Sequence, residues 1–161
     1  MLDIISGLPW HPLIVHATEV IVPAAALVVA LAALWPRFRR WAALLPLGLS
    51  VVALVLVPMS TQSGEALSER VTETSQIETH SELADGLFPW VFALVVVAAG
   101  LLWWNWNERK AAAPRAPKWV AIVLAVAAVL AATGTTVQAV LVGHSGATAV
   151  WSQVAKTPAK G

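Results

Sequence analysis

The sequence predicts an all-α integral membrane protein, a bundle of four helices that cross the bilayer. Hydrophobic residues make up 58 % of the 161 residues and charged residues 12 %, whereas about 25 % of the residues in a soluble domain are charged. This composition excludes a disordered chain, and the absence of cysteine excludes a disulfide scaffold and a thiolate metal site. The net charge of +1 gives no sign of a nucleic-acid partner.

The first predicted span covers residues 12–35 and contains one acidic residue, Glu19. A cleaved signal peptide has positive charge before its apolar core, but here Asp3 precedes the core and no Lys or Arg does. The basic residues follow the span, at 37–40. We therefore expect a retained helix whose N-terminus lies outside the membrane.

Three further segments are long and apolar enough for the roughly 20 residues that a spanning helix needs. They cover residues 41–61, 83–104 and 119–142, and each is uncharged over most of its length. The chain is thus expected to form one transmembrane domain, residues 1–152, and a flexible C-terminal tail, residues 153–161.

The charges between the spans predict the orientation. Lys and Arg dominate the segments 37–40 and 108–118, and acidic residues dominate 61–86. Cytoplasmic loops are enriched in Lys and Arg, so both termini and the 61–86 segment are expected outside a bacterial cytoplasmic membrane. Six tryptophans, which prefer the bilayer interface, mark the predicted inner ends of the spans: Trp35, Trp41, Trp103, Trp104, Trp106 and Trp119.

The acidic segment is itself expected to be helical, so that helices two and three extend beyond the membrane on the outer side. The second helix is expected to continue past Gly64 as far as Glu73. Ser75 and Glu78 fit a capping box, which predicts Ser75 as the N-cap of the third helix. Pro89 is a candidate kink in that helix.

All four histidines fall on the predicted outer side. With a rise of about 1.5 Å per residue, His16 lies about 28 Å from the inner tryptophans, and Glu65, His80 and His144 lie about 36–38 Å from them. The hydrocarbon core is about 30 Å thick. Glu19 is three residues from His16 on the same face. Four helices thus bring ligand-capable side chains to one layer.

Three interpretations of this layer remain open. Imidazole and carboxylate groups without cysteine suit haem b or a transition metal ion such as Cu, Fe, Zn or Mn. His16, His80 and His144 are the candidate cofactor ligands, and Glu19 and Glu65 are further candidate metal ligands. The same groups could handle protons, or could hydrogen-bond between helices and fix their register.

We also make predictions for two features next to these candidate ligands. His11 precedes Pro12, which suits the first turn of a helix, and we expect His11 to be an interface residue or a support for the ligands. Gly143 and Gly146 flank His144 and are expected to end the fourth helix.

The opening Trp10-His11-Pro12-Leu13-Ile14-Val15-His16 resembles the signature of a prokaryotic four-span membrane family, domain of unknown function 2231. His80 is similar to a histidine at the head of the family's third span, and Gly143 to Trp151 is similar to a pattern that ends its fourth. The resemblance covers about residues 8–152. Because some relatives carry Rieske-type or cytochrome c-type domains, it implies membrane redox work.

The chain departs from the family after its second histidine, where Ala17-Thr18-Glu19 replaces an apolar Phe-Pro. This change favours a metal site that uses His16 and Glu19. The preferred hypothesis is electron transfer or metal handling at an outward-facing His/Glu site, with a redox protein or respiratory complex as partner, or with a second copy of the chain. The alternative is a non-catalytic accessory or scaffold subunit, based on small residues of helix four. No hydrolytic triad is visible, and whether the protein is an enzyme is left open.

Overall fold

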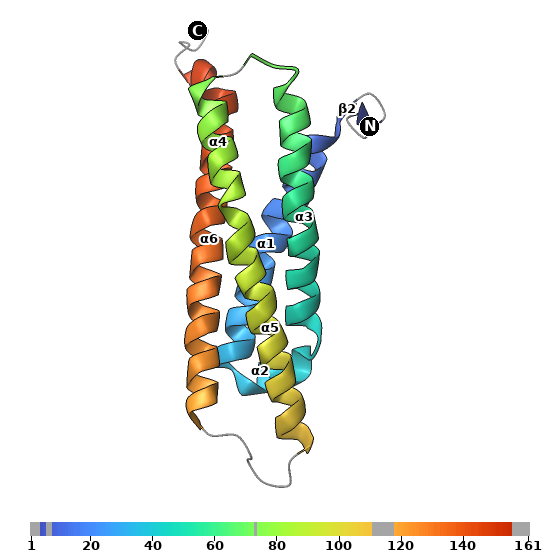
Figure 1. Cartoon of the computed structure of the whole chain (residues 1–161), viewed down its shortest axis with the longest axis vertical. Helices are drawn as coiled ribbons and strands as arrows, with labels where there is room; N and C mark the ends of the chain where they lie inside the picture. Colours follow the sequence, from blue (N-terminus) through green and yellow to red (C-terminus); the bar gives the residue numbers. More distant parts are fainter. Residues whose placement is uncertain (1–3, 6–7, 73, 111–117, 156–161) are drawn as a thin grey trace, which may run out of the picture.

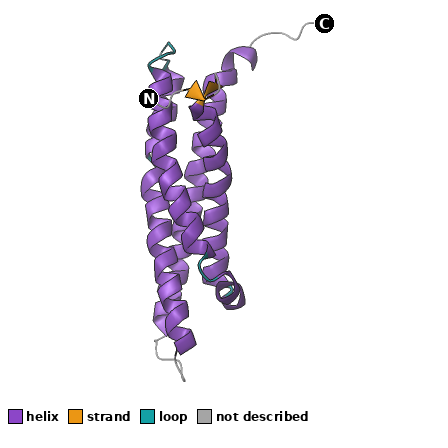
Figure 2. Ribbon diagram, turned by 90° about the vertical axis from the view of Figure 1, so that its right-hand side faces the viewer, coloured by secondary structure: helices purple, strands orange, loops and turns teal. Residues whose placement is uncertain are grey.

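The computed structural model describes residues 4–5, 8–72, 74–110 and 118–155. Four long helical rods lie side by side (Figures 1 and 2). Their helices are α1 (Trp10–Leu34), α3 (Leu45–Ser68), α4 (Ser75–Asp85) followed by α5 (Leu87–Lys110), and α6 (Lys118–Ala155). The short helix α2 (Pro36–Ala42) lies between α1 and α3. Two antiparallel two-residue strands, β1 (Ile4–Ile5) and β2 (Leu8–Pro9), precede α1 and are the one departure from an all-helical chain within the described residues.

The prediction of a helical chain with four helices capable of crossing a membrane is confirmed. Four helical stretches are long and apolar enough to cross a bilayer: Trp10–Leu34, Leu45–Ser68, Ser75–Arg109 and Trp119–Ser152. Large apolar side chains such as Leu27, Val55 and Leu130 are exposed along the outside of the rods, which suits contact with lipid. We call the end where α1 begins and α6 ends the upper end, and the end with α2 the lower end, as drawn in Figure 1.

The second rod begins later than the sequence predicted. Trp41 lies in α2, and α3 starts at Leu45. Pro46 has no N–H to donate to Ala42, so one helix cannot run through this point without losing a hydrogen bond. The chain turns instead at Ala43, a non-glycine residue with a positive φ of 46°. The rod ends at Ser68, and the expected end at Glu73 lies outside the described residues.

The prediction that Ser75 caps the third rod is wrong. Thr74 is the N-cap, because its backbone is extended (φ −129°, ψ 155°) and its hydroxyl accepts from the Ile77 N–H. Ser75 is the first residue of α4. Helix α4 ends at Asp85, four residues before Pro89, where the missing proline N–H and the ring disfavour a continuous helix.

The expectation that Gly143 and Gly146 end the fourth helix is also wrong. Helix α6 runs through both glycines to Ala155, which lies inside the predicted tail. A Cβ atom on Gly146 would lie 3.0 Å from the His80 ring, and one on Gly143 would lie 3.5 Å from a carboxylate oxygen of Glu19. These glycines therefore make room for side chains of neighbouring helices.

Two groups of buried apolar residues hold the rods together. The larger group is rich in alanine, which lets helices approach closely; its members are Ala26, Val29, Ala32, Leu94, Ala98, Leu101, Ala128, Ala131 and Ala132. The second group lies nearer the upper end and consists of Val22, Ala25, Ala53, Val57, Leu87 and Val91. Above this second group the packing opens into a cavity.

Candidate functional site

A cavity of about 620 Å³ lies between α1, α3, α4 and α6 at the upper end of the bundle. Its lower walls are apolar and include Val22, Val57 and Leu87. The polar side chains that line it include three histidines and two glutamates: His11, His16, Glu19, Glu65 and His80. Cavities of about 300–1,000 Å³ with mainly apolar walls and a few polar groups are typical ligand sites.

His11 lies in the first turn of α1 and is held by α3. Its Nδ1 atom is 3.0 Å from the Ser63 Oγ atom. The Ser63 hydroxyl donates its own hydrogen to the carbonyl oxygen of Ser60, at 2.9 Å, so its oxygen accepts from His11. In the neutral form of His11 the proton is therefore on Nδ1, and Nε2 carries the lone pair. Gly64, the next residue of α3, packs against the ring: a Cβ atom there would lie 3.1 Å from Cε1 of His11.

His80 lies on α4 and is held in the same way by α6. Its Nδ1 atom is 2.9 Å from the Ser145 Oγ atom, and the Ser145 hydroxyl donates to the carbonyl oxygen of Val142, also at 2.9 Å. The proton of His80 is therefore also on Nδ1. Gly146 follows Ser145 and packs against the His80 ring.

His16 is fixed within its own helix. Its Nδ1 atom is 2.5 Å from the carbonyl oxygen of Pro12, and since a carbonyl only accepts, this ring also carries its proton on Nδ1. Glu19 follows one turn later and lies near Gly143 of α6, where an added Cβ atom would be 3.5 Å from its Oε1 atom. Both side chains are exposed to the open volume of the cavity.

The polar groups of the cavity are mainly hydrogen-bond acceptors. The three imidazoles use their N–H groups on protein oxygens and leave Nε2 as an acceptor, and the two glutamates are acceptors when ionised. Three lining hydroxyls, on Thr18, Thr61 and Ser68, donate to carbonyl oxygens of their own helices. A cavity of this kind is complementary to a cation or to a ligand rich in N–H or O–H groups.

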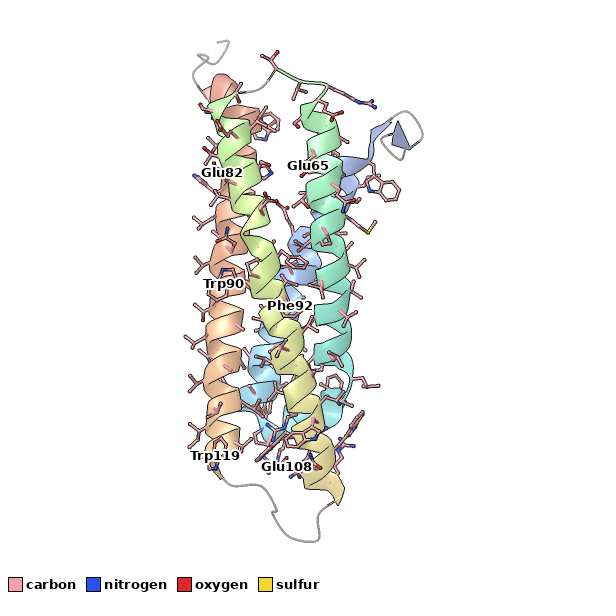
Figure 3. The ribbon with its side chains drawn as sticks, viewed as in Figure 1. Glu65, Glu82, Trp90, Phe92, Glu108 and Trp119 are labelled. Carbon is pink, nitrogen blue, oxygen red and sulfur yellow. The ribbon has the colours of Figure 1, made fainter. Side chains whose placement is uncertain are left out.

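The structure brings together four of the five predicted site residues: His16, Glu19, Glu65 and His80 all line the cavity. Figure 3 labels Glu65 on the upper part of α3. His144 is exposed and is not among the lining residues. Within the part of the chain that the structure describes, no three His, Asp or Glu side chains lie close enough together to hold one metal ion.

Sequence reasoning gave His11 a minor role and missed Ser63 and Ser145. The signal that could have found them is the dipeptide Ser-Gly, which stands at 63–64 and again at 145–146 near the ends of two predicted spans. A small residue followed by glycine lets a bulky ring from a neighbouring helix approach the backbone and still find a hydroxyl. The partner of each pair cannot be read from the sequence, because it depends on which helices are neighbours.

Comparison with known protein families shows which family the chain resembles. A family described as predicted membrane protein (DUF2231) matches residues 7–158, nearly the whole chain. The chain belongs to this family. The match confirms the resemblance seen in the opening motif and takes in every residue that lines the cavity of this DUF2231 protein. No curated protein and no solved structure matches the chain.

Proposed function

We propose that this DUF2231 protein holds haem b or a transition metal ion in its upper cavity and uses it for membrane electron transfer or metal handling. The observation that carries the proposal is the common state of three histidines in one cavity. Each of His11, His16 and His80 donates from Nδ1 to a protein oxygen. A histidine ligand of a metal characteristically donates its second ring N–H in this way, which orients the ring and raises its basicity.

The acceptor-rich lining supports the same proposal. A metal cation is complementary to imidazole Nε2 atoms and carboxylates, and Cu, Fe, Zn and Mn all accept such ligands. Glu19 and Glu65 are the further candidate ligands, and water would complete the coordination of a free ion.

The proposed orientation places the cavity on the outer face of a bacterial cytoplasmic membrane. The basic segment 37–40 lies within α2 at the lower end, and the acidic residues Glu65 and Glu82 lie at the upper end. Positive charge is enriched on the cytoplasmic side of membrane proteins. A redox protein or a respiratory complex at the outer surface is the proposed partner.

The test is a visible spectrum and a metal analysis of the full chain purified in mild detergent. We expect a Soret band or a stoichiometric metal, lost in His80→Ala and retained in His144→Ala. The second variant is a matched control, because His144 is a histidine of α6 that is exposed and outside the cavity lining. A wild-type protein with neither signal, or a signal equal in both variants, would overturn the proposal.

The alternative, an accessory or scaffold subunit, is based on close packing at small residues of the fourth helix. In the structure these residues pack inside the bundle. Ala131 and Ala132 are buried, and Gly134 lies against the ring of Trp90. The observation that motivated the scaffold role is thus accounted for within one chain. The scaffold proposal now depends on finding a partner, or a second copy of the chain, that co-purifies with the protein.

A further inference from the structure

Two histidines of the upper cavity are held by the same device on different helix pairs. On α3, Ser63 accepts from His11 and Gly64 packs against its ring. On α6, Ser145 accepts from His80 and Gly146 packs against its ring. The distances match closely: the two N–O separations are 3.0 and 2.9 Å, and a Cβ atom on either glycine would lie 3.1 or 3.0 Å from Cε1 of the ring. Below, "Ser-Gly cradle" means either pair.

We propose that His11 and His80 are the two axial ligands of a single haem b bound in the upper cavity. This inference rests on the proposed function and names the cofactor and the ligand pair. His16 has no Ser-Gly cradle, because its N–H donates within its own helix, and we place it in the cavity wall.

The number of available protein ligands favours haem over a free ion. Among the described residues no three ligand-capable side chains converge on one point. Haem iron takes four ligands from the porphyrin and needs only two from the protein, for which a pair of imidazoles is suitable. His11 lies on α1 and His80 on α4, and both side chains line the same cavity.

The size and lining of the cavity favour the same cofactor. A free ion with its ligands needs little space, whereas this cavity holds about 620 Å³. Its walls carry apolar side chains from four helices, including Val22, Val57, Leu87 and Val142. The apolar macrocycle of haem would cover these walls and remove them from water. Its two carboxylates would need to face water, because no Lys or Arg is among the described residues that line the cavity.

Ser63 and Ser145 have a positioning role in this arrangement. Each hydroxyl oxygen accepts a hydrogen bond from Nδ1–H of its histidine, which in the neutral ring keeps the lone pair on Nε2. Each following glycine limits the rotation of the ring by direct packing. A hydrogen bond to the far nitrogen of a ligand ring also tunes the electronic properties of the metal.

The first experiment titrates the purified full-length protein with haemin in detergent. We expect one haem per chain, with the low-spin optical and electron paramagnetic resonance spectra of iron held by two imidazoles. His11→Gly and His80→Gly should each lose the low-spin form, and free imidazole should restore it. Rescue requires a folded cavity, so it separates loss of a ligand from loss of fold. His144→Ala is the matched control and should keep the low-spin spectrum, because His144 is exposed and lies outside the cavity lining.

The second experiment tests the cradles. Ser63→Ala and Ser145→Ala should weaken haemin binding by about 10- to 100-fold, as is typical for partners of metal-binding histidines, and should shift the reduction potential of the bound haem. Ser63→Thr should retain the wild-type potential, since it keeps the hydroxyl. A purely structural role for the serines would change thermal stability and leave the potential unaltered.

The outcomes separate the two proposals. Low-spin haem lost in both His→Gly variants supports the pair. Haem that stays low-spin in either variant without added imidazole overturns it. If haemin does not bind but copper, iron, zinc or manganese binds in a His80-dependent way, the inference fails and the proposed function stands. If neither haemin nor a metal ion binds, both fail.

Discussion

The two ends of the bundle arrange their polar groups in opposite ways. At the lower end, Arg39 is buried and binds a carboxylate: its NH2 atom is 3.0 Å from Oε2 of Glu108, and its NH1 atom is 3.3 Å from the carbonyl oxygen of Ala32. Figure 3 shows Glu108 at this end, in a crowded set of side chains. At the upper end, three histidines and two glutamates surround an open volume.

The contrast indicates which polar residues serve the fold and which are available for a ligand. Arg39 and Glu108 neutralise each other, and the small residue Ala32 is completely buried beside them. The upper histidines have one nitrogen fixed and the other without a donor among the described residues. A histidine that served only to join helices would be expected to form hydrogen bonds through both ring nitrogens, or to be packed as tightly as Arg39.

The largest effect is expected at the lower end, from Arg39→Ala. This change removes the partner of a two-thirds-buried carboxylate, so we expect a loss of about 3 kcal/mol in the free energy of unfolding, the lower part of the range for broken buried ion pairs. Unfolding in detergent measures it. Arg37→Ala, at an exposed position of the same helix, should change stability by less than about 0.5 kcal/mol. Equal effects of the two changes would show that the lower end is not closed by this ion pair.

The next largest effect on stability is expected from a pair of variants that compares how tightly the two ends are packed. Ala32 has no exposed surface, so Ala32→Leu should overpack the lower core and cost about 2 kcal/mol. Ala84 lines the upper cavity, and Ala84→Leu should leave stability within about 0.5 kcal/mol because the new side chain enters open space.

The same Ala84→Leu variant should bind the cavity ligand more weakly than the wild type, which haemin titration and metal analysis would measure. A large loss of stability in Ala84→Leu would contradict the comparison, because it would show that the upper end is packed as tightly as the lower.

Much of the fold is predictable from the sequence because the bilayer imposes a simple rule. Uncharged stretches such as 87–104 and 119–142 admit few structures other than spanning helices. Helix boundaries were less predictable. Gly143 and Gly146 resemble a helix end by composition, but packing against Glu19 and His80 from other helices explains them. That contact depends on helix rotation, which a one-dimensional pattern does not contain.

The sequence predicts the depth of the candidate site along the helices, but it does not predict which side chains face the cavity. Depth along each helix follows from counting residues, and it correctly brought His16, Glu65 and His80 to one end. Whether a side chain faces the cavity depends on the angle around the helix axis. His144 and Ser145 are adjacent in α6, yet His144 is exposed and Ser145 binds His80.

A smaller effect is expected where α5 crosses α6, between the two ends. A Cβ atom on Gly134 would overlap carbons of the Trp90 ring. Gly134→Ala should therefore cost about 1 kcal/mol, because Trp90 is 40 % exposed and its ring can shift. Gly48 has nothing within 4 Å of the corresponding position, so Gly48→Ala should stabilise the protein by about 0.5 kcal/mol through helix propensity. If Gly134→Ala lowers the free energy of unfolding and Gly48→Ala raises it, the close contact between α5 and α6 is supported. Changes of the same sign in both variants would contradict it.

The smallest effect concerns the start of the third rod, at the edge of the upper end. The Thr74 hydroxyl accepts from the Ile77 N–H at 3.4 Å, a long bond. Thr74→Ala should therefore cost about 0.5 kcal/mol, the lower part of the range for N-cap residues. Ser75 lies inside the first turn of α4, so Ser75→Ala should be neutral or slightly stabilising. Hydrogen exchange at the first turns of α4 can resolve the difference. If Ser75→Ala frays these turns and Thr74→Ala does not, then α4 begins one residue later, and the turn that leads to His80 is set by the capping box read from the sequence.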